Sequence, residues 1–138
     1  MCTPEFRHQL PEKIHPKDIL NTVLIHDASM SSFVGFPSWA TWFNVAGLDV
    51  QVPSQGLHIN NSAAVLQTAL DSHGIALARS VMAHDDILAG RLVRLFPAIR
   101  CPSSMAYYVV YRLEPDLPAH VQAFRCWLLA QAAQYQRI

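Results

Sequence analysis

Two short turns in the sequence combine polar side chains with the local features of an anion-binding site. In the first, His58-Ile59-Asn60-Asn61-Ser62, a predicted strand runs directly into a predicted helix. The second, Ala78-Arg79-Ser80, follows a short apolar strand. Free backbone N–H groups and the positive end of the helix dipole attract anions at such turns, and the Arg79 guanidinium suits a carboxylate. The two turns are therefore candidate contacts for a small anionic ligand.

The same residue types also have a purely structural explanation. Asn61 and Ser62 are types that cap helices, because their side-chain oxygens accept hydrogen bonds from the first helical N–H groups. Arg79 is equally suited to a surface ion pair. Both explanations stay open for all three residues.

The spacing of the histidines does not favour a metal site. The closest local cluster, His84-Asp85-Asp86, lies inside a predicted helix and is typical of a surface acidic stretch. No two histidines have the i, i+4 spacing of a helical zinc site. We therefore predict scattered surface histidines, with no metal site and no cofactor. The seven histidines are His8, His15, His26, His58, His73, His84 and His120.

Enzymatic motifs are also missing from the sequence. Neither a G-x-S-x-G elbow nor a G-x-G-x-x-G loop is present. Cys101 follows Arg100, but a catalytic thiol would need a low pKa supplied by a positioned histidine. We therefore predict that the chain is not an enzyme.

Charge and cysteine content restrict the partners and the compartment. Ten basic residues are balanced by ten acidic ones, which makes a poor surface for nucleic-acid phosphates. Cys2, Cys101 and Cys126 are odd in number and far apart, as expected for free thiols in a reducing compartment. No apolar run approaches the roughly 20 residues of a membrane span, and no signal core is present. The expected location is cytoplasmic, without membrane contact.

Strands and helices are predicted to alternate along the chain, which indicates an α/β fold with a mostly parallel sheet. Residues 1–20 are rich in proline and charge and are predicted to be loop with one short turn. Ser80 is expected to cap one helix and Gly74 to end another. The predicted strands are 22–26, 56–60, 75–78, 92–96 and 105–112, and the predicted helices are 37–47, 63–73, 81–88 and 119–134.

Several segments together resemble the effector-binding domain of LysR-type transcriptional regulators. One group is A-A-V-L-Q-T-A-L at 63–70, G-I-A-L-A at 74–78 and L-A-G-R-L-V at 88–93; a second is A-Y-Y-V-V at 106–110 and A-F-R-C-W-L at 123–128. W-A-T-W-F at 39–43 with A-G-L at 46–48 resembles the glycine-cleavage-activator-like branch. Each piece is weak alone, and their combination is specific from residue 20 onward.

The resemblance implies half of a two-lobed fold like a type II periplasmic binding protein, with a mostly parallel sheet flanked by helices. Residues 1–20 would be a connector, 21–102 the second lobe, and 103–138 a strand and helix that return to a first lobe with no counterpart here. The winged helix-turn-helix through which such regulators bind DNA has no counterpart either. This chain would then contact DNA only through a domain outside it.

In the family, the effector lies in the cleft between the lobes and changes the geometry of the oligomer. The resemblance therefore implies a small-molecule effector, either an anionic metabolite or an amino-acid-like ligand. For Tyr107 the structural alternative is a place in the core of the sheet, and the sequence favours that alternative. Carried over by position, the candidate ligand contacts are Asn60, Asn61, Ser62, Ala78, Arg79 and Tyr107.

Two other functions remain open at this point. Without a first lobe, strand 105–112 and helix 119–134 would present an unpaired edge and an uncovered apolar face, which favour self-association. The chain would then be a stand-alone interaction module that pairs with itself or with a full-length regulator. The other possibility is a binding protein for small anions that is unrelated to transcription.

Overall fold

The computed structural model of the chain describes residues 1–29, 33, 35–102, 106–111 and 117–135. These residues divide into two units, Met1–Met105 and Ala106–Ile138.

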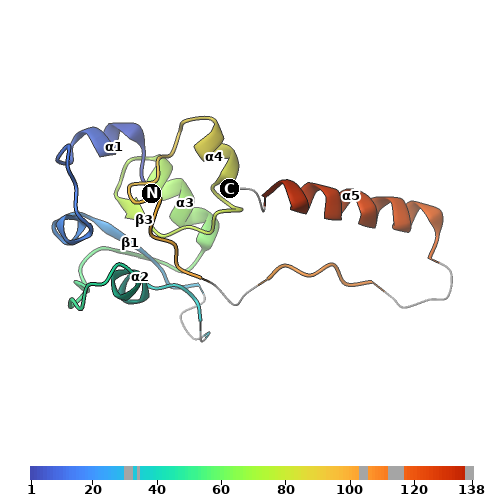
Figure 1. Cartoon of the computed structure of the whole chain (residues 1–138), viewed down its shortest axis with the longest axis horizontal. Coiled ribbons are helices and arrows are strands. Elements are labelled where there is room, and N and C mark those ends of the chain that lie inside the picture. The colour runs from blue at the N-terminus through green and yellow to red at the C-terminus, as the bar shows by residue number, and fades with distance from the viewer. Residues whose placement is uncertain (30–32, 34, 103–105, 112–116, 136–138) are drawn as a thin grey trace. The chain divides into compact units, whose positions relative to one another are not determined.

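The first unit is built on a three-stranded parallel sheet with the strand order β2-β1-β3 (Figure 1). Its strands are β1 (Leu24–Asp27), β2 (Leu57–Ile59) and β3 (Ile75–Ala76). In the register, Asp27 of β1 lies opposite Ile59 of β2, and Ile25 lies opposite Ala76 of β3. The predicted parallel α/β arrangement is therefore confirmed.

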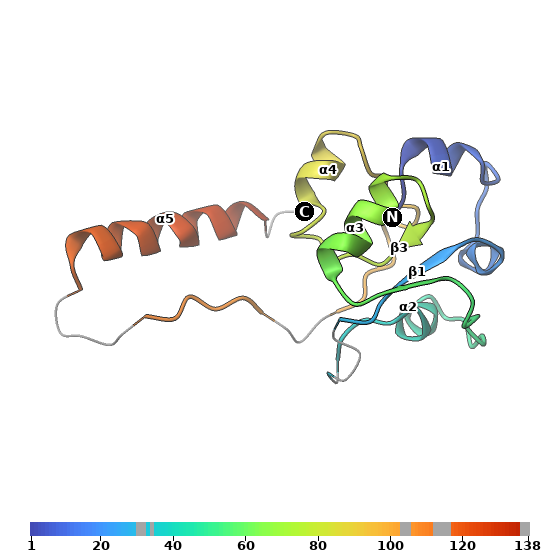
Figure 2. The same ribbon diagram turned by 180° about the vertical axis from the view of Figure 1, so that it is seen from behind.

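Helices cover both faces of this sheet. Successive side chains of a strand point to opposite faces, so the neighbours Leu24 and Ile25 enter two different clusters, and both are buried. Helix α2 (Trp39–Val45) and helix α3 (Ser62–Leu70) lie on opposite sides of β1 in both views (Figures 1 and 2). Apolar residues on both faces are typical of parallel strands that are covered on each side.

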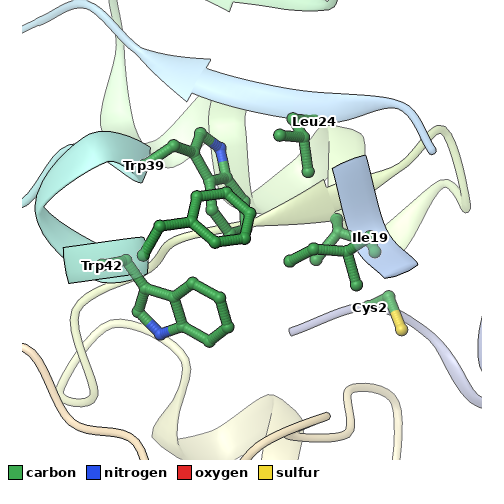
Figure 3. Close-up of a cluster of buried hydrophobic side chains, with 7 residues drawn as sticks. Cys2, Ile19, Leu24, Trp39 and Trp42 are labelled. Carbon is green, nitrogen blue, oxygen red and sulfur yellow. The ribbon is translucent and has the colours of Figure 1, made fainter. Parts of the chain in front are cut away.

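The first cluster packs aromatic side chains of α2 against the sheet (Figure 3). Trp39 and Trp42 meet edge to face with ring centroids 5.7 Å apart, and Phe43 is fully buried beside them. The indole N–H of Trp39 donates a hydrogen bond of 3.0 Å to the carbonyl of Ile25, which ties α2 to β1. The other buried members of the cluster are Cys2, Ile19, Leu24 and Ile75.

The second cluster lies under α3 and the short helix α4 (His84–Leu88). Val65, Leu66 and Ala69 form the buried stripe of α3, and their spacing is that of an amphipathic helix. They pack with Ile25, Ala76, Ala83 and Leu92.

The helix caps follow the sequence in most places. Asn61 caps α3, as predicted. Helix α2 begins at Trp39 rather than at the predicted residue 37, and Ser38 caps it by accepting from the Thr41 N–H at 3.1 Å. Gly47 after α2 has a positive φ of 76°, which glycine adopts without steric cost. The predicted ends of these helices are confirmed at Gly47 and, for α4, at Gly90.

The end of α3 differs from the prediction. Ser72, rather than Gly74, has the left-handed conformation that closes the helix, with φ of 60°. The Ser72 hydroxyl shares a hydrogen bond of 2.6 Å with the Thr3 hydroxyl, which helps to offset the cost of that conformation. Gly74 is needed for another reason, since a Cβ there would lie 2.5 Å from the Val23 carbonyl oxygen.

Residues 1–20 are not the predicted loop with one short turn. They contain helix α1 (Pro4–His8) and the 3₁₀ helix η1 (Pro16–Asn21). Cys2 is fully buried and forms an antiparallel bridge with Val93, while Met1 exchanges backbone hydrogen bonds with Ala76. Both contacts join residues that are more than 70 positions apart in the sequence. The proline and charge content of residues 1–20 therefore gave no indication of them.

Two further predictions in the first unit are wrong. Helix 81–88 begins only at His84 and is not capped by Ser80, since Ala83 occupies the cap position. Strand 92–96 is reduced to the single bridge at Val93, because only Cys2 pairs with it.

The second unit contains helix α5 (Ala119–Tyr135), which confirms the predicted helix 119–134. Residues 106–111 form neither helix nor strand, so the predicted strand is wrong over this range; 105 and 112 lie outside the described residues. A strand requires a hydrogen-bonded neighbour, whereas a helix bonds within itself. Among the described residues, no helix is long and apolar enough to cross a membrane.

Candidate functional site

The candidate site lies where β1 and β2 end. Beyond the last paired residues, Asp27 and Ile59, the Ala28 N–H donates a hydrogen bond of 2.8 Å to the Ile59 carbonyl. Both strands therefore end at one edge of the sheet. The chain leaves β2 through Asn60 and enters α3 at Ser62, so the N-terminus of α3 lies beside Asp27. This is the edge at which open α/β sheets usually bind ligands.

Asp27 is the centre of a hydrogen-bond network at this edge. The Ser62 hydroxyl donates to Asp27 Oδ2 at 2.6 Å. The Ser29 N–H donates to Asp27 Oδ1 at 2.9 Å, and the Ser29 hydroxyl donates to the same oxygen. The two hydroxyls lie 3.0 Å apart. The network joins the end of β1 to the first turn of α3, and its three side chains are all half-buried.

Sequence reasoning missed Asp27 and Ser29, because both were assigned to a loop after the first strand. The available signal was the position of Asp27 directly after an apolar run in a parallel sheet, where a polar side chain reaches the carboxyl edge.

The predicted residues of the first turn have different surroundings. Asn61 Oδ1 accepts from the Ala63 and Ala64 N–H groups at 2.9 and 3.0 Å, which confirms the capping explanation for Asn61. Ser62 is in the first turn of α3 and bonds Asp27 instead of acting as the cap. Asn60 is exposed at the end of β2. Ligand contact by these residues stays a prediction.

The second predicted turn follows β3, on the other side of β1 from α3's entry turn. Ala78 and Arg79 are half-buried there. The Arg79 carbonyl accepts from the N–H groups of Met82 and Ala83, at 3.0 and 3.2 Å, which shapes the turn before α4.

Tyr107 belongs to the second unit and is 71% exposed. The sheet-core explanation for Tyr107 is therefore wrong for this chain. Its contact with an effector stays a prediction.

The described residues support neither a metal site nor a nucleophilic thiol. No group of three or more His, Cys, Asp or Glu side chains there could hold a metal ion. Burial raises the pKa of the Cys101 thiol, which disfavours the thiolate that a nucleophile requires.

Comparison with known proteins identifies the family. Residues 1–133 match the model of the LysR substrate binding domain. The chain belongs to this family. The match begins at residue 1, in agreement with the packing of Cys2 against Val93 in this LysR substrate-binding domain. The domain is a regulatory one and not an enzyme, and the relatives are named as transcriptional regulators or activators.

Individual relatives are similar over most of this domain. The glycine cleavage system transcriptional activator of Escherichia coli (strain K12) is 37% identical over 121 residues, which are 88% of this chain and 37% of that protein. The regulator PtxR of Pseudomonas aeruginosa is 30% identical over 125 residues, 90% of this chain and 38% of PtxR. The chain thus spans somewhat more than a third of the length of these relatives.

A solved structure supports the fold of the LysR domain. The effector domain of the transcriptional regulator AmpR of Pseudomonas aeruginosa matches with a TM-score of 0.66 and 29% identity. The match covers 99% of this chain and 61% of that one. The predicted fold, like that of a type II periplasmic binding protein, is confirmed.

Proposed function

We propose that this LysR substrate-binding domain senses a small molecule at the carboxyl edge of β1 and β2. The observation that carries the proposal is the Asp27–Ser62 hydrogen bond, which places a carboxylate against the first turn of α3. Asn60, Asn61 and Ser62 would line one side of the bound molecule, and Ala78 and Arg79 would contribute from the turn after β3.

The charge of Asp27 helps to choose between the two expected ligand classes. A simple anion would be repelled by this carboxylate, whereas an amino-acid-like ligand has an ammonium group that Asp27 would attract. The ligand's carboxylate would interact with Arg79. We therefore favour an amino-acid-like effector over a purely anionic metabolite.

Binding would act by favouring one of two conformations of the domain. Residues 21–102 would form the second lobe, with residues 1–20 as the connecting segment leading into it. Residues 103–138 would return to the first lobe of a complete effector domain. The changed lobe arrangement would alter the geometry of the oligomer, and DNA would be contacted through a winged helix-turn-helix domain outside the residues described. In that setting the protein would act in the cytoplasm.

A thermal-shift screen of the 138-residue chain tests this function, with free amino acids and matched carboxylic acids without an amino group. A ligand at a hundredfold excess over its dissociation constant stabilises the protein by about 2.7 kcal/mol. We expect an amino acid to stabilise the wild-type chain, and Asp27→Asn and Ser62→Ala to remove the effect.

Ser38→Ala is the matched control, because Ser38 is a helix-capping hydroxyl of α2, which lies on the opposite side of β1 from α3. It should lower the basal melting temperature and leave the ligand-induced shift intact. Stabilisation by carboxylic acids alone, or an undiminished shift in both site variants, would contradict the proposal.

A second candidate function is an interaction module, favoured by the exposed apolar residues of the second unit. Tyr108 and Val110 are 81% and 89% exposed, and Phe124 and Trp127 stack on the surface of α5 with ring centroids 5.6 Å apart. Exposed aromatic residues of this kind are typical of interfaces. They would pair with a second copy of the chain or with a full-length regulator.

Sedimentation of the chain over a range of concentrations tests this candidate. We expect self-association that Trp127→Ser weakens. Leu88→Ser is the control, because Leu88 is an exposed apolar residue of α4 in the first unit. A purely monomeric chain at high concentration would contradict self-association, and co-purification with a full-length regulator would then test the remaining partner.

A further inference from the structure

Two histidines face each other across the pair of strands that ends at the candidate site. His26 of β1 and His58 of β2 are directly opposite in the register. Their rings are stacked, with centroids 4.3 Å apart and an angle of 10° between the ring planes. The next pair along the strands is Asp27 and Ile59. The stack is therefore one residue away from the Asp27–Ser62 hydrogen bond.

The Nε2 atoms of the two rings differ in their hydrogen bonding. His58 Nε2 lies 3.0 Å from the Ser54 carbonyl oxygen, which can only accept, so this nitrogen carries the proton. His26 Nε2 is buried and has no hydrogen-bond partner within the described part of the chain. The backbone at Gly56 closes over the His26 ring, because a Cβ at Gly56 would lie 3.2 Å from His26 Nε2. A proton on His26 Nε2 would have no acceptor among the residues that the structure describes.

The ionisable side chains next to His26 on the paired strands are His58 and Asp27. His58 is the residue stacked on the His26 ring, while residues 54–56, β3 and α2 contain no ionisable side chain. Asp27 is the next residue of β1, but it points to the other face, and its carboxylate already accepts from Ser29 and Ser62. Burial, and then the charge of His58, lower the pKa of His26 below 6.5. His26 is therefore neutral at neutral pH.

We propose that the stacked His26–His58 pair is an acid-sensitive latch that holds β1 to β2 at neutral pH and releases this edge of the sheet when both rings are protonated. Two imidazolium rings at this distance would repel each other, and the buried nitrogen would lack an acceptor. Because the latch adjoins Asp27, acidification would weaken effector binding. This last consequence depends on the proposed function, whereas the latch itself does not.

The sign of the pH dependence follows from the direction of the shift. His26 takes up a proton more readily in the unfolded chain than in the folded one, so the unfolded state binds more protons as the pH falls. The stability due to neutral His26 is fully present above the unfolded pKa of 6.5. It decreases as the pH falls below that value toward the lowered folded pKa.

Urea unfolding of the 138-residue chain between pH 7.5 and pH 5 tests the latch. We expect the midpoint of the wild type to fall with acidification, and His26→Phe to reduce this fall because phenylalanine keeps a stacking ring and cannot take up a proton. His73→Gln is the matched control, since His73 is exposed on the turn after α3, and it should keep most of the wild-type fall. An equal fall in the wild type and in His26→Phe would overturn the proposal.

A second measurement covers the case in which His26→Phe does not fold. In an NMR titration of the wild-type chain, the His26 ring should titrate below the ordinary histidine value of 6.5. His58→Phe should move the His26 titration upward. Titration of His26 at or above 6.5, unaffected by His58→Phe, would also overturn the latch. Neither readout needs an effector, so failure of the latch and failure of the effector screen are distinguishable.

Discussion

Similar apolar segments are buried in strands in the first unit and exposed without strand structure in the second. In the first unit, Leu24, Ile25 and Ile75 are each only 1% exposed, because strands lie beside them and helices cover both faces. In the second unit, the equally β-prone residues 106–111 are exposed and form no strand. The difference is the presence of a hydrogen-bonded neighbour, which no property of a single segment supplies.

The helices of the two units show the same contrast in a weaker form. Helix α3 buries Val65, Leu66 and Ala69 against the sheet. Helix α5 leaves Phe124 and Trp127 more than half exposed, in contact mainly with each other. Arg125 lies 5.1 Å above the ring of Tyr111, which is a cation–π contact. Helix α5 forms nonetheless, because its backbone hydrogen bonds are internal.

The largest expected difference between the units concerns the removal of one large aromatic side chain from each. Phe43→Ala should destabilise the chain by about 3 to 5 kcal/mol, because Phe43 is fully buried between Trp39 and Trp42. Phe124→Ala should change the stability of the isolated chain by less than about 0.5 kcal/mol. Urea unfolding followed by tryptophan fluorescence measures both. Similar losses in the two variants would show that the second unit is as tightly packed as the first.

A smaller effect is expected at Gly74, where strand β1 passes close to the turn before β3. Gly74→Ala should cost about 1 to 3 kcal/mol, because the new methyl group would overlap the Val23 carbonyl. Gly47→Ala provides the comparison, since nothing lies within 4 Å of a Cβ there and only the positive φ opposes it, at roughly 1 to 2 kcal/mol. Crystal structures of both variants should show a shift of the backbone at Val23 only for Gly74→Ala, and the absence of any shift would contradict the close approach.

The smallest effect concerns the hydrogen bond between Ser72 and Thr3, which joins the N-terminal segment to the end of α3. Ser72→Ala keeps the left-handed strain and loses the bond, so we expect a loss of about 0.5 to 1.5 kcal/mol in thermal unfolding. Gln122→Ala on the exposed surface of α5 should change stability by a few tenths of a kcal/mol at most. If Ser72→Ala behaved like Gln122→Ala, the N-terminal segment would contribute little through this contact.

Sequence reasoning succeeded where the signal is local. The spacing of Val65, Leu66 and Ala69 predicted α3, and the residue type at Asn61 predicted its cap. It failed where a residue acts through a distant partner. Ser72 takes the left-handed position instead of Gly74 and shares a hydrogen bond with Thr3, and Cys2 is buried because Val93 pairs with it.

The residues of the candidate site were also predictable only where the signal is local. The turn at Asn60, Asn61 and Ser62 was found from sequence, because a strand followed directly by a capped helix is visible in residue types. The role of Asp27 was not, since its contact with Ser62 spans 35 residues and depends on the parallel register of β1 and β2.

The sequence by itself determined the α/β class, the family resemblance, the main helices and the turn at Asn60, Asn61 and Ser62. These features follow from periodicity, capping and short-range patterns that each segment carries alone. Only the tertiary structure decided which apolar segments are buried, where Asp27 places its charge and which histidines are stacked. Those outcomes depend on pairing between strands that are far apart in the chain, and pairing is a property of two segments together.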